Sequence, residues 1–191
     1  MVLAHLSDTK IILASKSPRR QELLKGLGIT FEVKTQEVDE SYPDSLENKK
    51  VAEYLAQKKA NVFQLKSSEI LITSDTTVLL ENQILNKPKN AAEAEKMLNL
   101  LSDKSHHVIT GVCLKSLDKE MVFSETTKVS FKKLTKEEVQ HYVQHYKPFD
   151  KAGAYGIQEW MGYIGIKQLE GCYYNVMGLP LSRLYQELLD F

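Results

Sequence analysis

An apolar run that meets a helix-start signal is the feature that most constrains the fold of this chain. Residues 11–13 are Ile-Ile-Leu, and "ASKSPRR" follows them. Ser17 is a residue type favoured at a helix N-cap, and Pro18 suits the first helical position because no backbone N–H is needed there. The sequence therefore predicts a short strand, a turn, and a helix that ends at the "GLG" of residues 26–28.

Strand and helix patterns alternate along the rest of the chain. We expect a strand over 30–38, a helix over 46–65 capped by Ser45, a strand from 69 that breaks near Ser74–Asp75 and turns at 81–82, a helix over 91–102 capped by Asn90, a hairpin over 106–134, a helix after Thr135 with Glu138 as a capping box, a strand over 163–171, and a last helix opened by Pro180. Interleaved helices with hairpins predict a mixed α/β fold.

Composition excludes several classes of function. The 191 residues carry a formal net charge of +0, which argues against a nucleic-acid partner. No apolar run approaches the length of a membrane span, and the first residues lack the pattern of a secretory signal. We therefore expect no membrane partner and a cytoplasmic location, with Cys113 and Cys172 as reduced thiols.

Two arginines stand where a helix is already electropositive. Arg19 and Arg20 fall in the first turn, where each cation should cost roughly 0.3–1 kcal/mol. With Ser15 and free backbone N–H groups, they would suit a phosphate chain. The alternative is that both side chains enter solvent or pair with Glu22 and Glu32. If the substrate supplies the missing negative charge, Arg20→Gln should stabilise the empty protein slightly and abolish turnover.

Acidic residues form two further candidates. Asp75 follows the apolar stretch "ILITS", and a carboxylate at the exit of a buried strand can hold a divalent cation or orient a water. The alternative is a turn in which Asp75 accepts from the Thr76 and Thr77 amides. Asp39 and Glu40, with Glu37, would form a second metal-facing cluster or an exposed loop edge.

A Gly-rich tract and two lysines complete the candidates. The tract "DKAGAYGIQ", residues 150–158, allows close backbone approach to a ligand, and Gln158 could read the edge of a base. It is neither a GxGxxG motif nor a Walker loop. The alternative for this tract is a turn between elements. Lys59 and Lys87 could bind phosphate, but each taken singly is a typical surface charge.

The histidines do not form a catalytic arrangement. His106 and His107 alternate at the start of an expected strand and should face opposite sides. Ser15 lacks the context of a nucleophile elbow, so no Ser-His-Asp triad is predicted.

The order of these segments is more specific than any one of them. "LASKSPRRQELLKGLGITFEV", "SDTTV", "ILNKPKNAAEAEKMLNLLSDKSHHVITGV", "DKAGAYGIQ" and "GCYYNVMGLPLSRL" occur in this order from near the N-terminus to the last helix. Together they resemble the Maf family of nucleoside triphosphate pyrophosphatases over essentially the whole chain.

This resemblance implies an activity and a fold. It implies hydrolysis of a nucleoside triphosphate to the monophosphate and pyrophosphate with Mg²⁺ or Mn²⁺, in an elongated mixed α/β structure of the Maf/ITPase type. One domain over residues 1–191, with two lobes around a central cleft, and a homodimer are expected. "SDTTV" and "DKAGAYGIQ" resemble the branch that acts on dTTP and UTP. The alternatives are the sister branch that acts on 7-methyl-GTP, and a non-catalytic nucleotide-binding regulator of cell division.

The resemblance also implies roles at matching positions. These are proton acceptor and metal ligand for Asp75, metal ligand for Glu40, substrate specificity for Arg19, Thr76 and Gln158, and phosphate binding for Ser15, Arg20, Lys59 and Lys87. The sequence departs from the family at Ser74, where Ala is common, and at "EWMG" after Gln158. Trp160 therefore bears on the fine specificity.

Overall fold

The fold is built on one mixed β-sheet. The computed structural model describes residue 6 and residues 8–191. Its seven strands are β1 (Lys10–Leu13), β2 (Phe31–Val33), β3 (Glu69–Leu80), β4 (Gln83–Leu85), β5 (Ser105–Lys115), β6 (Glu120–Phe131) and β7 (Ile166–Glu170). They follow the order β2-β1-β3-β5-β6-β7, with β4 paired to β3. β1 is parallel to β2 and β3, whereas β3–β4 and β6–β7 are antiparallel, so the expected mixed α/β class is confirmed.

Helices flank this sheet. They are α1 (Pro18–Gly26), α2 (Val51–Ala60), α3 (Ala91–Leu101), α4 (Lys136–Tyr146), α5 (Trp160–Gly165), α6 (Tyr173–Met177) and α7 (Leu181–Leu189), with short 3₁₀ turns η2 (Asn48–Lys50) and η3 (Ala152–Ala154). No helix within the described residues is long and apolar enough to cross a membrane.

The chain divides into two compact units. The first contains the described part of residues 1–75 with 110–125 and 178–191, and the second contains 76–109 and 126–177. Strands β3, β5 and β6 contribute residues to both units. The single domain over residues 1–191 stays a prediction.

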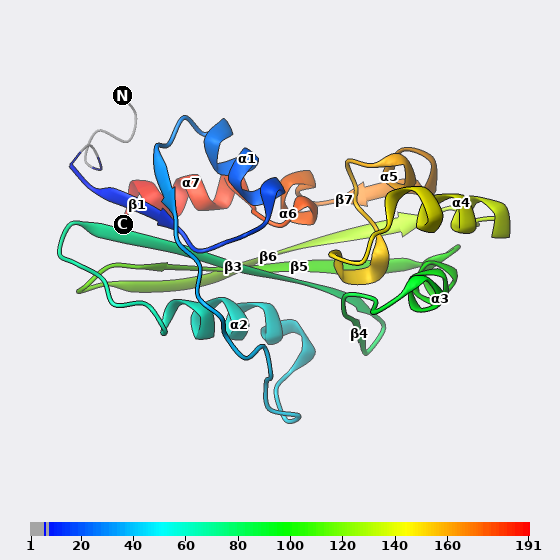
Figure 1. Ribbon diagram of the computed structural model, residues 1–191, viewed down its shortest axis with the longest axis horizontal. Coiled ribbons are helices and arrows are strands. Elements are labelled where there is room, and N and C mark those ends of the chain that lie inside the picture. The colour runs from blue at the N-terminus through cyan, green and yellow to red at the C-terminus, as the bar shows by residue number, and fades with distance from the viewer. Residues whose placement is uncertain (1–5, 7) are drawn as a thin grey trace. The chain divides into compact units, whose positions relative to one another are not determined.

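In the first unit, helices cover both faces of the sheet. α1 and α7 lie on one face and α2 on the other (Figure 1). Ile12, Ala56, Leu71 and Cys113 form part of its buried core. A Cβ on Gly111 of β5 would lie 2.3 Å from the backbone carbonyl carbon and oxygen of Ala52 in α2. Helix α2 therefore packs on β5 at a distance that only glycine permits.

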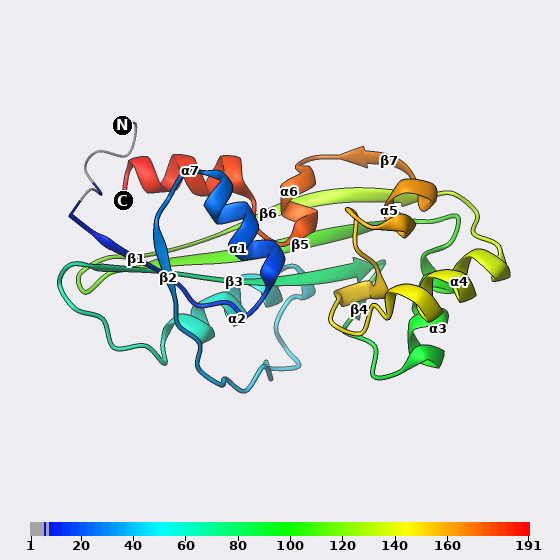
Figure 2. The same cartoon turned by 45° about the horizontal axis from the view of Figure 1, so that its top comes forward.

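The second unit is built around α3 and α4. These helices lie next to each other, and η3 packs against α3 (Figure 2). Val78, Leu98, Val129 and Met161 belong to its buried core. Strand β7 completes this unit by pairing with the end of β6.

Local helix signals in the sequence are confirmed. Helix α1 begins at Pro18 after Ser17. Asn90 caps α3 by accepting from Glu93 N at 2.9 Å, and Thr135 forms the expected capping box with Glu138.

Other boundaries are wrong, for reasons that packing explains. The helix after Ser45 begins as η2 and continues as α2 from Val51, because the buried stripe starts there and residues 47–50 present no apolar face. β3 runs unbroken through Ser74–Asp75. β2 and β7 are shorter than the expected strands, and residues 160–165 form α5, which buries Met161.

Candidate functional site

A charged cluster in the first unit brings together four of the predicted site residues. We call it the charged cluster. It comprises Arg20 in α1, Glu40 in the loop after β2, Lys59 in α2 and Asp75 in β3. Ser15 lies in the same unit, in the turn between β1 and α1.

Asp75 owes its position to the register between β1 and β3. β1 ends at Leu13, which is paired with Ile72, and Ala14 N donates to Ile72 O at 2.9 Å. β3 continues past this point, so Asp75 lies just beyond the carboxyl end of β1. Asp75 was expected at the carboxyl end of its own strand. It lies instead near the carboxyl end of the neighbouring β1, because β3 does not break there. The Asp75 side chain is 13% exposed.

Lys59 connects the two carboxylates of the charged cluster. Its Nζ lies 2.5 Å from Asp75 Oδ1 and 2.7 Å from Glu40 Oε1. The Lys59 side chain is only 17% exposed, so these contacts are shielded from much of the solvent. One ammonium thus balances two carboxylates from different elements.

Arg20 is fixed by main-chain carbonyls. Its Nε donates to Gly178 O at 2.9 Å, and its Nη1 donates to Ser74 O at 2.8 Å, next to Asp75. Burial lowers the pKa of Arg20, and the charges of Asp75 and Glu40 oppose this shift. A guanidinium stays protonated in proteins, so Arg20 is a fixed cation beside Asp75. Its two carbonyl contacts reverse the expectation that Arg20→Gln stabilises the protein.

Glu40 reaches Lys59 from a loop attached to α2. Lys58 Nζ donates to Ser41 O at 2.7 Å and to Asp39 Oδ2 at 3.2 Å. Ser41 N donates to Asp39 Oδ1 at 3.0 Å, which closes the turn around Glu40. Two successive lysines of α2 therefore hold this loop, although the Glu40 side chain itself is half exposed.

In the turn before α1, Ser15 and not Ser17 makes the side-chain hydrogen bond to the backbone. Ser15 Oγ accepts from Ser17 N at 3.2 Å, and Gln21 Nε2 donates to Ser15 O at 3.2 Å. Ser17 holds the N-cap position without a side-chain cap bond. Its buried Oγ has no hydrogen-bond partner in the described part of the chain, and such an atom is a natural contact for a bound anion. Arg19 is half-buried in the same first turn.

A divalent cation fits the charged cluster only if waters and phosphate oxygens complete its coordination. No group of three or more His, Cys, Asp and Glu residues with metal-site geometry occurs among the described residues. The two carboxylates that meet at Lys59 are hard oxygen donors, which Mg²⁺ accepts together with waters and phosphate oxygens.

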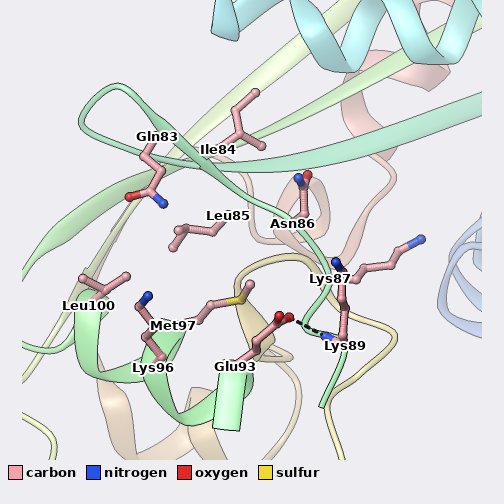
Figure 3. Close-up of a pocket in the computed structure, with 10 residues that line it drawn as sticks. All are labelled: Gln83, Ile84, Leu85, Asn86, Lys87, Lys89, Glu93, Lys96, Met97 and Leu100. Atoms are coloured by element: carbon pink, nitrogen blue, oxygen red, sulfur yellow. Dashed lines mark hydrogen bonds between the residues drawn. The ribbon is translucent and has the colours of Figure 1, made fainter. Parts of the chain in front are cut away.

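Three predicted site residues, Thr76, Lys87 and Gln158, belong to the second unit. Gln158 follows η3, and its buried Oε1 has no hydrogen-bond partner in the described structure. Lys87 is exposed on the lining of a pocket of about 300 Å³ between β4 and α3, and its side chain points away from Met97 (Figure 3). Their relation to the charged cluster stays a prediction.

A hydrogen-bonded network beside Gln158 in the chain was not predicted from the sequence. Tyr142 of α4 contacts Gly156 and Glu159, and Glu159 also contacts Lys151. The available signal was helical spacing, because Tyr142 follows the buried Val139 at i+3 and shares its face. Spacing predicts burial of such a tyrosine but does not reveal the partner of its hydroxyl.

The fold and the charged cluster define a mixed α/β protein with a site suited to a phosphate chain. The sequence profile described as "Maf-like protein" matches residues 10–191, and the chain belongs to the Maf family.

Relatives over the full length support this assignment. The chain is 50% identical to a dTTP/UTP pyrophosphatase of Parabacteroides distasonis, with 100% of both chains covered, and 50% identical to one of Phocaeicola vulgatus, with 98% of both covered. A dTTP/UTP pyrophosphatase of Flavobacterium psychrophilum is 47% identical over 100% of this chain and 98% of its own. The solved structure of the Staphylococcus aureus Ham1 protein, 18% identical, shares the fold with a TM-score of 0.52, covering 94% of this chain and 100% of that one.

Proposed function

We propose that this protein hydrolyses dTTP and UTP to the nucleoside monophosphate and pyrophosphate. The observation that carries the proposal is the contact of Lys59 with both Asp75 and Glu40, beside the fixed guanidinium of Arg20. Such an arrangement offers cations for a triphosphate and carboxylates for water and metal. The full-length relatives named dTTP/UTP pyrophosphatase support the same reaction.

Asp75 is the group assigned to the attacking water. Its carboxylate orients the water and accepts its proton as the water oxygen bonds to the α-phosphorus. The bond between the α-phosphorus and the bridging oxygen breaks, and that oxygen leaves with pyrophosphate. Arg20 and Lys59 offset the negative charge of the phosphates during this step.

Asp75 and Glu40 are the residues that would hold a divalent cation. Bound Mg²⁺ or Mn²⁺ supplies further neutralisation of phosphate oxygens. Since Lys59 already contacts both carboxylates, it would share them with such a cation, and its ammonium would add positive charge beside the phosphates. Ser15 and Lys87 are assigned to the same phosphates by the family resemblance.

Gln158 is the residue assigned to the base. Its unpartnered Oε1 can accept the N3–H of uracil or thymine, and its amide N–H can donate to a ring carbonyl. Arg19 and Thr76 complete the specificity residues in this proposal. The homodimer belongs to the proposal on the family resemblance, and the cytoplasmic location belongs to it as an expectation from the sequence.

Pyrophosphate release from a panel of nucleoside triphosphates tests this function. We expect release from dTTP and UTP with Mg²⁺ or Mn²⁺, and loss of release after chelation. Faster turnover of 7-methyl-GTP would move the protein to the sister branch. Binding of dTTP without any release would indicate a regulator.

A further inference from the structure

One buried phenol holds both sides of the turn that carries Gln158. Glu159 N donates to Gly156 O at 3.1 Å, so residues 156–159 form a β-turn with Gln158 at its third position. The Tyr142 hydroxyl accepts from Gly156 N at 3.0 Å and donates to the Glu159 carboxylate. It therefore contacts the turn two residues before Gln158 and again one residue after it.

Gly156 is required for this arrangement. A Cβ at this position would lie 2.8 Å from Glu159 Cδ and 3.0 Å from Glu159 Oε2. The carboxylate thus occupies the space beside the glycine, where it reaches the phenol. Any side chain at this position would push Glu159 away from Tyr142.

The surroundings keep the Tyr142 hydroxyl a hydrogen-bond donor. Tyr142 is fully buried, and burial together with Glu159 raises its pKa, so the phenol stays protonated at neutral pH. Lys151 Nζ lies 3.1 Å from Glu159 Oε1 and balances the carboxylate, which would otherwise be costly at a partly buried site.

The Gln158 Oε1 has no hydrogen-bond partner in the described structure, so this oxygen takes no part in the network around Tyr142. We propose that Tyr142, Gly156 and Glu159 are positioning residues for base recognition, which fix the main-chain turn that presents Gln158 to the pyrimidine. This inference rests on the proposed function, and it adds three residues that touch neither phosphate nor base.

Tyr142→Phe tests the inference by removing one oxygen atom. Gly156 N–H and Glu159 lose their partner, so we expect the KM values for dTTP and UTP to rise roughly tenfold, as for one lost hydrogen bond. We expect kcat to stay within about twofold, because base contacts made equally before and during reaction affect KM alone. A merely structural role would instead lower the active fraction, and hence kcat, at unchanged KM.

Tyr146→Phe is the matched control. Tyr146 lies one turn further along α4, its ring stacks on Tyr142 at 5.0 Å, and it is 41% exposed. Its loss of a hydroxyl should leave both KM and kcat unchanged. Equal effects of the two variants would overturn the inference.

A double variant shows whether Tyr142 acts through Gln158. If it does, Tyr142→Phe adds nothing to the KM of Gln158→Ala, because the presented amide is already gone. Additive effects would overturn the inference, as would a Gln158→Ala protein with unchanged KM. Gly156→Ala should give the same pattern and replaces Tyr142→Phe should that variant not fold. The proposed function fails separately, through absence of pyrophosphate release by the wild-type protein.

Discussion

Lys59 Nζ lies 2.5 Å from Asp75 Oδ1, which joins the last turn of α2 to the middle of β3. Neither side chain is more than 17% exposed, so the pair is better shielded than an ordinary surface ion pair. The same ammonium contacts Glu40. Removal of either carboxylate therefore leaves Lys59 with a partner, which separates effects on chemistry from effects on folding.

Asp75→Asn should abolish most of the turnover without unfolding the protein. The amide cannot accept the proton of the attacking water, and we expect pyrophosphate release from dTTP to fall by at least ~10²-fold. The melting temperature should stay close to that of the wild-type protein, because Lys59 keeps its contact with Glu40. Asp118→Asn, in the exposed turn between β5 and β6, is the control. Near wild-type turnover in folded Asp75→Asn would remove Asp75 from the mechanism.

Arg20→Gln should lower both stability and activity. The substitution leaves the carbonyls of Ser74 and Gly178 without their guanidinium donor, which we expect to cost about 1–3 kcal/mol of unfolding free energy. Arg20→Lys should restore little, because one ammonium cannot reproduce a planar fork of donors. Urea unfolding measures the effect, with Lys16→Gln, an exposed cation next to the same helix, as the control. Stabilisation by Arg20→Gln would contradict this prediction.

Sequence could predict those parts of the fold that short-range signals determine. Helix α1 begins at Pro18, and the caps at Asn90 and Thr135 form as predicted, because each depends on residues within four positions. The strand register was not predictable in this way. Asp75 was expected at a strand end, but only the pairing of Leu13 with Ile72 shows which strand ends there.

The contacts of the charged cluster depend on the whole fold. Arg20 meets Ser74, 54 positions away, and Gly178, 158 positions away, and both acceptors are backbone carbonyls. A carbonyl carries no sequence signal, so residue types alone predicted an Arg20 that lacks a compensating partner until substrate binds. The role of Tyr142 was not predictable for the same reason, since one of its partners is the backbone N–H of Gly156.

His106 should make stability depend on pH. It is buried in β5, shares a hydrogen bond of 2.7 Å with the Tyr155 hydroxyl, and burial lowers its pKa to about 3. The unfolded chain, with a histidine pKa near 6.5, binds more protons below that pH, so stability falls as the pH is lowered from about 6.5 toward 3. At pH 5 the loss from this residue is about 2 kcal/mol.

Urea unfolding between pH 7 and pH 5 checks this dependence. His106→Phe should remove that part of the slope, whatever its stability at pH 7. His107→Gln, which alters the exposed neighbour on the opposite side of β5, should retain it. An unchanged slope in His106→Phe would assign the pH dependence to other groups.

Gly111→Ala should displace the helix that carries Lys59. A methyl group at this position would lie 2.3 Å from the carbonyl carbon and oxygen of Ala52, and backbone atoms of a packed helix cannot yield as a flexible side chain does. We expect α2 to move off β5, with a loss of unfolding free energy beyond the 1–3 kcal/mol typical of overpacking.

Gly26→Ala is the matched control, because nothing lies within 4 Å of its Cβ and its effect should stay within about 1 kcal/mol of zero. Thermal melting of both variants decides the comparison: equal melting temperatures would show that α2 does not require this close approach. Any Gly111→Ala protein that still folds should release less pyrophosphate, since Lys59 would no longer meet Asp75.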